Sequence, residues 1–208
     1  MNTQSTNSCA NLIYSGNSSI KQIALTCDCD GLNYDHTHEI LDVLKKHQIK
    51  ATFFLSGLWV KKYPETARRI ASEGHEIGNH SYEHPDLRQR SYTEIKRSIK
   101  RAEETIKEIT GINPRPLFRA PYGYQDNKVL KAVNDVGYNY SFLWSIDTCD
   151  YMQPPSKDIV QTIFENVRRG HIILMHGHGK NTAVAIDFAI ETLKTFDFKF
   201  ITVSELLK

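Results

Sequence analysis

The sequence predicts a single-domain α/β fold, in the form of a small and incomplete or distorted (β/α) barrel. Short apolar runs typical of buried strands alternate along the chain with amphipathic helical patterns, which indicates a mostly parallel sheet. About seven such units fit the length of a small barrel. Five polar clusters each follow an apolar run, where functional side chains gather at the carboxyl ends of barrel strands. We therefore expect these clusters to meet in one site.

Strands are expected where short apolar runs lie between polar or glycine-containing segments. The run at residues 172–175 is the most apolar of them and should be a buried strand. The expected strands are residues 23–26, 52–55, 76–78, 117–118, 140–146, 172–175 and 199–203.

Helices are expected where apolar residues recur at helical spacing and a glycine follows the last turn. Ser91 and Glu94 form a capping-box pattern that opens a long helix, which Gly111 ends. The other expected helices are residues 36–47, 64–72, 127–136, 157–169 and 183–194.

Composition limits the classes of function. The 208 residues are 40% hydrophobic and 24% charged, which suits one globular domain. The net charge of +2 and the lack of a basic run with interleaved aromatics argue against a nucleic-acid partner. No apolar stretch approaches the ~18 residues of a membrane span. We expect a flexible lead-in at residues 1–20 and one folded domain at residues 21–208.

The first twenty residues are rich in Asn, Ser and Thr. They contain neither the basic segment nor the apolar core of a secretory signal. Two alternatives follow for the location of the protein: it is cytoplasmic, or an export signal has been trimmed from the sequence.

The five clusters contain the residue types of a metal-dependent hydrolase. They are residues 28–31 (DCDG), 80–84 (HSYEH), 119–123 (RAPYG), 147–151 (DTCDY) and 172–176 (IILMH). His80 and His84 are four residues apart, so both imidazoles can face one cation. A carboxylate of Asp28 or Asp30 would complete a set of three ligands and leave positions open for water and substrate.

Zinc is the metal expected for this set of ligands. A mixed nitrogen and oxygen site also accepts cobalt, nickel or manganese.

The remaining polar residues suit acid–base catalysis. One of the two aspartates can act as the base for water, and Arg119 beside it would hold that base ionised and oriented. His176 is placed as a general acid for a leaving amine, and Asp150 could hold it as the imidazolium. The turn after Arg119 can direct the backbone N–H of Tyr122 into the pocket, where it would stabilise an oxyanion.

Aromatic residues near the clusters offer faces on which sugars stack. Tyr151 and Trp144 are the two in question, and core packing is an equal alternative for Trp144. His178, which two glycines flank, is expected to be a mobile loop residue without a role.

The cysteines are expected to be small apolar residues near strand ends. Cys27 and Cys29 are two apart on one strand and should point to the same face. A disulfide or a thiolate metal ligand is the alternative interpretation.

Together the five clusters resemble the motifs of the polysaccharide deacetylases, the NodB-like carbohydrate esterases of family four. The resemblance covers roughly residue 20 to the C-terminus. The family motif Thr-Phe-Asp-Asp-Gly is similar to residues 26–31 (TCDCDG), and Asp-x-x-Asp-Trp is similar to residues 147–151 with Tyr for Trp. The His-Ser/Thr-x-x-His, Arg-x-Pro-Tyr and Leu-x-His motifs are complete at residues 80–84, 119–122 and 174–176.

The resemblance implies a distorted (β/α)7 barrel that hydrolyses N-acetyl, occasionally O-acetyl, groups of chitin-like, peptidoglycan or xylan-like glycans. It also implies a role for each motif residue. Leu174 would line the pocket for the acetyl methyl group. The other roles are Asp28 as base with Arg119 as its partner, His80 and His84 as metal ligands, and His176 as acid with Asp150 as its partner.

Two departures from the family pattern bear on the site. Cys29 stands between the two aspartates, so either the metal-binding carboxylate is displaced to Asp30 or Cys29 itself ligates. Tyr151 replaces the family tryptophan and changes one wall of the substrate groove.

The expected function is metal-dependent removal of acetyl groups from the N-acetylated amino sugars of a glycan, with release of acetate. Three alternatives remain at this point. The protein could be a deacylase of a small non-glycan amide in the same fold, or a glycan-binding protein with a weakened metal site. A thiol-regulated protein that uses Cys27, Cys29 and Cys149 is the third.

Overall fold

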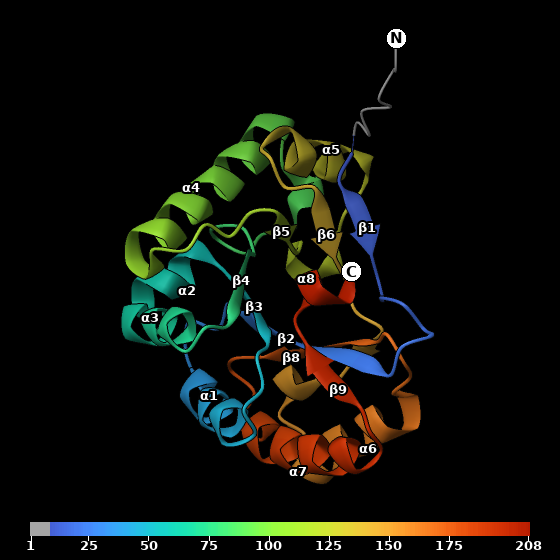
Figure 1. Ribbon diagram of the computed structural model, residues 1–208. Helices are drawn as coiled ribbons and strands as arrows, with labels where there is room; N and C mark the ends of the chain where they lie inside the picture. Colours follow the sequence, from blue (N-terminus) through green and yellow to red (C-terminus); the bar gives the residue numbers. More distant parts are fainter. Residues whose placement is uncertain (1–8) are drawn as a thin grey trace.

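A computed structural model describes residues 9–208 and shows one curled, parallel sheet wrapped by helices (Figure 1). The strand order is β1-β6-β5-β4-β3-β2-β8-β7, and β9 pairs with the first residues of β2. The strands are β1 (Asn11–Ile13), β2 (Gln22–Cys29), β3 (Thr52–Leu55), β4 (Glu76–Asn79), β5 (Leu117–Phe118), β6 (Tyr140–Phe142), β7 (Ile146–Asp147), β8 (Ile172–His176) and β9 (Lys199–Ile201).

β1 and β7 lie at the two ends of the strand order and do not pair with each other in the described chain. The sheet is therefore an open, distorted barrel, which confirms the expected fold class. All strand pairs within it are parallel. Their carboxyl ends consequently share one rim of the barrel.

Helices cover the outer face of the sheet, with α4 and α5 on one side and α1, α6 and α7 on the other (Figure 1). Between residues 9 and 208, no helix is both long and apolar enough to cross a membrane. The helices are α1 (Thr37–Lys46), α2 (Gly57–Lys62), α3 (Pro64–Ser72), α4 (Tyr92–Thr110), α5 (Asn127–Asp135), α6 (Ser156–Asn166), α7 (Thr182–Thr195) and α8 (Val203–Leu206).

The longest helix, α4, begins and ends where the sequence indicates. The Ser91 side chain accepts a hydrogen bond from the Glu94 backbone, and the Glu94 carboxylate accepts one from the Ser91 backbone. Gly111 follows the last turn in the left-handed conformation, with φ 74°. That conformation is easy for glycine and unfavourable for other residues.

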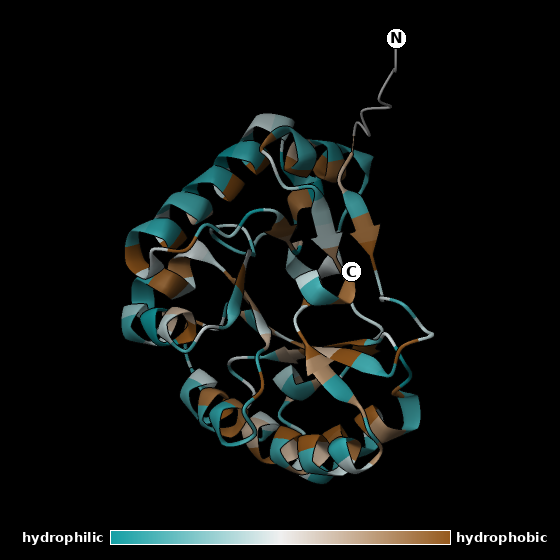
Figure 2. Cartoon of the chain, in the orientation of Figure 1, coloured by the Kyte–Doolittle hydropathy of each residue, from teal (hydrophilic) through white to brown (hydrophobic). Residues whose placement is uncertain are grey.

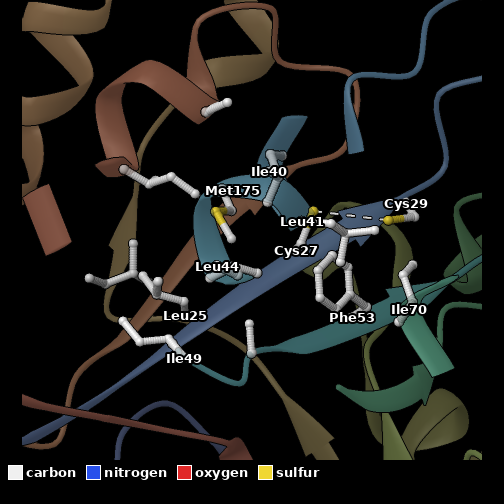
Figure 3. Packing of buried hydrophobic residues seen from close by; sticks show 14 of the residues in the cluster. Leu25, Cys27, Cys29, Ile40, Leu41, Leu44, Ile49, Phe53, Ile70 and Met175 are labelled. Carbon is white, nitrogen blue, oxygen red and sulfur yellow. Dashed lines mark hydrogen bonds between the residues drawn. The ribbon is translucent and has the colours of Figure 1, made fainter. Parts of the chain in front are cut away.

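The main core lies between the sheet and the outer helices. Ile40, Leu41 and Leu44 of α1 pack there against buried side chains of β2, β3 and β8 (Figure 3). The hydrophobic side of the helices accordingly faces the sheet, and their hydrophilic side faces outward (Figure 2). Because the helices are amphipathic, this burial is the main force that holds them on the sheet.

A second cluster fills the inside of the barrel. It joins Ala24, Phe54 and Phe142 on the inner face of the sheet to Val203 and Leu206 of α8. The short C-terminal helix therefore packs against the interior that lies beneath the carboxyl rim.

Cys27 and Cys29 point to the same face of β2, as expected, and that face is the outer core (Figure 3). Their Sγ atoms lie 3.9 Å apart, and all four cysteines of the chain are free. Burial raises the pKa of both thiols, which disfavours the thiolate that a metal requires. The alternative of a disulfide is wrong.

The structure differs from the expectation at three places. Asn11–Ile13 falls within the expected flexible lead-in, yet it forms β1 and pairs with β6; residues 1–8 of that lead-in lie outside the described residues. The single strand expected at residues 140–146 is two strands, β6 and β7, on opposite parts of the sheet. The helices α2 and α8, of six and four residues, were not expected.

Replacing Leu44 by alanine is expected to lower the free energy of unfolding by about 2–5 kcal/mol, because its fully buried side chain leaves a cavity between α1 and the sheet. Urea denaturation followed by circular dichroism measures the loss. Lys45→Ala, one residue further on the exposed side of the same helix, should change stability by no more than ~0.5 kcal/mol. Equal losses in the two variants would contradict the packing described.

Candidate active site

The carboxyl rim of the barrel holds a cavity of about 330 Å³ to which all five sequence clusters contribute. The first cluster lies at the end of β2, where successive side chains point to opposite faces of the sheet. Asp28 faces the cavity, whereas its neighbours Cys27 and Cys29 face the outer core. The cavity is lined by Asp28, Asp30, His84, Tyr122, Tyr124, Trp144, Asp147, Tyr151, Leu174, His176 and His178.

Asp30, His80 and His84 form the one group in the described chain whose side chains converge as metal ligands would. One ligand atom from each lies within 4.8 Å of the others. Nε2 of His84 lies 3.1 Å from Nε2 of His80 and 3.0 Å from Oδ2 of Asp30. Separations of 3.0 and 3.1 Å suit ligand atoms that share one ion at roughly 2.0–2.2 Å, the distance typical of zinc.

The hydrogen bond and the pKa of His80 suit a metal ligand. Its Nδ1–H donates to the carbonyl oxygen of Arg119 at 2.8 Å, which leaves the Nε2 lone pair directed at His84 and Asp30. Burial lowers the pKa of His80 to about 4, so the ring is neutral near pH 7. A neutral imidazole is the form that binds metal.

The carboxylate of Asp30 also fits a cation. Its Oδ1 atom is buried and, among residues 9–208, makes no well-aligned hydrogen bond. Burial alone would raise the pKa of Asp30, but the rings of His178 and His84 outweigh burial and hold the pKa well below its usual range. A buried, ionised carboxylate whose Oδ2 faces His84 is a suitable metal ligand.

Asp28 is paired with a fully buried arginine. Nη1 of Arg119 donates to Oδ1 of Asp28 at 2.7 Å and to Oγ1 of Thr26 at 2.9 Å. Its Nε and Nη2 donate to the carbonyl oxygens of Phe142 and Leu143 at 3.2 and 3.0 Å. The second Asp28 oxygen, Oδ2, lies 3.5 Å from Nε2 of His80. Asp28 therefore lies beside the candidate metal group with its orientation fixed.

His176 and Asp150 form a second pair across the cavity. Nδ1 of His176 donates to Oδ1 of Asp150 at 2.8 Å, and the hydroxyl of Thr182 donates to Oδ2 at 2.6 Å. Burial by itself would lower the pKa of His176, but the hydrogen bond to Asp150 raises it to about 9. The ring is thus a cation near pH 7 and can give up a proton.

Apolar and aromatic side chains surround these polar groups. Leu174 lines the cavity below His176, and the ring of Tyr151 meets the His176 ring edge-on at 5.1 Å. The Tyr122 ring meets His84 edge-on at 4.5 Å and is more than half exposed. Trp144 both lines the cavity and packs on the inner core. The groove therefore offers aromatic surface at its entrance.

The structure places Cys29 away from the candidate metal group. Its Sγ lies 3.9 Å from both Cys27 Sγ and Thr37 Oγ1, inside the outer core. Asp30, one residue later, occupies the position toward His80 and His84 instead. Cys149 is exposed and does not line the cavity.

Sequence reasoning missed two residues of the cavity. His178 was expected to be a mobile loop residue, yet it lines the cavity with Nδ1 3.4 Å from Oδ1 of Asp30. Tyr124 lines the same cavity. The strand register could have indicated His178. Asp28 is the partner of His176 in the parallel pair β2 and β8. Two residues after each of them, Asp30 and His178 are therefore expected to lie side by side.

Comparison with known proteins agrees with this architecture and site. A family profile described as polysaccharide deacetylase matches residues 15–141. The chain belongs to the polysaccharide deacetylase family. The resemblance that the motifs indicate is thereby confirmed.

Individual members of the family resemble the chain over most of its length. A peptidoglycan-N-acetylglucosamine deacetylase from Bacillus cereus is 36% identical over 200 residues, covering 94% of this chain and 71% of the relative. The solved structure of PdaA from Bacillus subtilis, a family 4 carbohydrate esterase, has a TM-score of 0.87 at 34% identity and covers 94% of this chain and 84% of that one. A CE4 family pseudoenzyme from Bacillus anthracis has a TM-score of 0.88 at 33% identity and covers 95% and 69%.

Replacing Arg119 by methionine is expected to lower the free energy of unfolding of the deacetylase by about 3–5 kcal/mol, because Asp28 then remains as an uncompensated buried charge. Urea denaturation of the metal-free protein measures the effect. The double variant Arg119→Met/Asp28→Asn should recover part of the loss. A double variant as unstable as the single one would show that charge pairing is not the cause.

Asp150→Asn is expected to lower the pKa of His176 from about 9 to below its ordinary 6.5, because burial then acts without the opposing carboxylate. NMR titration of the His176 ring in metal-free protein measures this. Since the folded pKa is raised, the pair stabilises the fold fully below pH 6.5, and that contribution is lost as the pH rises to about 9. The exposed control Asp158→Asn should leave the titration unchanged.

Proposed function

We propose that this member of the polysaccharide deacetylase family is an active, metal-dependent enzyme that removes acetyl groups from N-acetylated amino sugars of a peptidoglycan-like or chitin-like glycan. The observation that carries the proposal is the position of two ionised pairs, Asp28–Arg119 and Asp150–His176, in one cavity with the Asp30, His80 and His84 group. A base, an acid and a metal site are what amide hydrolysis by water requires.

Asp30, His80 and His84 would hold the metal, and zinc suits two imidazoles and one carboxylate, with cobalt, nickel and manganese as alternatives. When bound, a metal of this kind polarises the acetyl carbonyl and makes water a stronger nucleophile near neutral pH. The Oδ2 of Asp30, 3.0 Å from Nε2 of His84, and the neutral Nε2 of His80 support this assignment.

The acid–base roles follow from the two ionised pairs. Asp28 accepts a proton from water as the water oxygen attacks the acetyl carbonyl carbon, while the hydrogen bond from Arg119 keeps the carboxylate fixed. His176 donates a proton to the amine nitrogen as the C–N bond breaks, since Asp150 keeps the ring protonated. Acetate and a free amino sugar are the products.

Other cavity residues would orient the substrate. The backbone N–H of Tyr122 is proposed as a donor to the developing oxyanion, and Leu174 as the contact for the acetyl methyl group. Tyr151 and Trp144 offer aromatic faces for the sugar ring. The Bacillus cereus relative is a peptidoglycan-N-acetylglucosamine deacetylase, and PdaA of Bacillus subtilis is a peptidoglycan-N-acetylmuramic acid deacetylase. Both relatives support an amino sugar of peptidoglycan as the acetylated group.

One second candidate has an observation of its own. The likeness to a family pseudoenzyme favours a protein without turnover, which is one feature of the glycan-binding alternative. The two ionised pairs argue against it, because binding alone needs neither a buried base nor a protonated histidine.

Acetate release tests the proposal directly. Metal-stripped protein is incubated with N-acetylglucosamine oligomers or with peptidoglycan, before and after zinc, cobalt or nickel is added. Release that depends on metal is expected. Binding of the glycan without release under any of these metals would favour the pseudoenzyme alternative, and release only from small acetylated amides would favour a non-glycan deacylase.

His176→Ala is expected to lower kcat roughly 10²–10⁴-fold, since it removes the proposed acid, while metal binding stays intact. His36→Ala removes a histidine whose side chain pairs with Glu39 outside the cavity, and it should keep normal turnover. Rates of acetate release and metal content are measured on both. Normal turnover in His176→Ala would remove that residue from its proposed role.

A further inference from the structure

We propose that His178 is a positioning residue that holds Asp30 in place as a metal ligand. The inference rests on the metal site proposed above and extends it to a residue outside the family motifs quoted for this chain. It also explains how the site accommodates a carboxylate that stands one residue later than the family pattern requires.

The displaced aspartate lacks the support of a strand. β2 ends at Cys29, and Cys29 itself turns into the outer core. Asp30 is the next residue, so the backbone ladder that orients Asp28 does not extend to it. A carboxylate in such a position needs a side-chain partner if it is to keep one orientation.

His178 is placed to be that partner by the register of the two central strands. Asp28 pairs with His176 across β2 and β8, and the backbone N–H of Gly177 then donates to the carbonyl oxygen of Asp28 at 2.9 Å. This bond continues the pairing past the end of β8. Asp30 and His178 therefore face each other at the rim of the cavity.

The two side chains meet through atoms that have no other partner. Nδ1 of His178 lies 3.4 Å from Oδ1 of Asp30, and both atoms are buried without a well-aligned hydrogen bond in residues 9–208. The other oxygen of Asp30, Oδ2, faces His84 at 3.0 Å. One oxygen is thus directed at the metal group and the other at His178.

His178 itself is held in this position. Its carbonyl oxygen accepts a hydrogen bond from Nε2 of Gln153 at 3.1 Å, and its ring lies 5.4 Å from the ring of His176. Gly31 lies directly against it, since a Cβ there would be 2.6 Å from the His178 Cβ. His178 is not one of the three converging ligands, so it acts on the metal through Asp30.

Zinc affinity of the metal-stripped protein tests the proposal without relying on turnover. Isothermal titration is carried out on the wild type, His178→Ala, His178→Asn and the control His36→Ala. Removal of a partner that orients a ligand typically weakens metal binding by about 10–100-fold, and this loss is expected for His178→Ala. Asn places a side-chain N–H near the position of Nδ1, so His178→Asn should recover most of the affinity.

The control separates this effect from the loss of an arbitrary histidine. The His36 backbone N–H donates to the carbonyl of Gly177 in the same loop, whereas its side chain lies outside the cavity. His36→Ala should bind zinc as the wild type does. The metal-free melting temperature should be the same in all four proteins, since His178 is proposed to act on the ligand and not on the fold.

Wild-type zinc affinity in His178→Ala would overturn the inference and leave the proposed function standing. Zinc binding that depends on His178, without acetate release from any glycan, would instead overturn the function alone. Should His178→Ala fail to fold, Gly31→Ala takes its place, because the added Cβ would push the His178 ring away from Asp30. Unchanged zinc affinity in Gly31→Ala would then overturn the inference.

Discussion

The buried Arg119 guanidinium is the interaction on which the rest of this site depends. It carries a full positive charge inside the barrel, with its Cζ 4.2 Å from the centre of the Phe54 ring. Hydrogen-bond acceptors around it offset the free-energy cost of burying this charge. Those acceptors come from β2 and from the end of β6. Its backbone pairs with Asn79 of β4, and its carbonyl oxygen fixes the His80 ring. One residue thus couples the geometry of the proposed base, of one candidate ligand and of three strands.

Burial and hydrogen bonding give His80 and His176 different charge states. His80 and His176 are both buried at the same rim, yet burial dominates the first and lowers its pKa to about 4, whereas Asp150 dominates the second and raises its pKa to about 9. A neutral ring suits a ligand and a protonated ring suits an acid. The Nδ1 of His80 donates to a backbone carbonyl oxygen, whereas the Nδ1 of His176 donates to the Asp150 carboxylate.

Much of this arrangement is predictable, because the carboxyl ends of parallel strands must share a rim. Asp28 and His176 each end a clear apolar run, so their proximity follows from the sequence pattern alone. The residues that were missed depend on features without such a pattern. Residues 140–146 read as one strand because they contain no turn signal, and the chain leaves the sheet at Leu143, whose carbonyl oxygen accepts from Arg119. His178 was missed because its position beside Asp30 depends on the register between β2 and β8.

The pleat of β2 has a consequence for how this protein can change over evolutionary time. Cys27 and Cys29 pack in the outer core under α1, whereas Asp28 between them faces the cavity. Exchange of one residue for another alters one of these surfaces and spares the other. Insertion or deletion of one residue within the strand would instead interchange the two faces. It would place an aspartate in the hydrophobic core and a cysteine at the cavity. An insertion or deletion inside this strand therefore disturbs both surfaces at once, whereas a substitution disturbs only one of them.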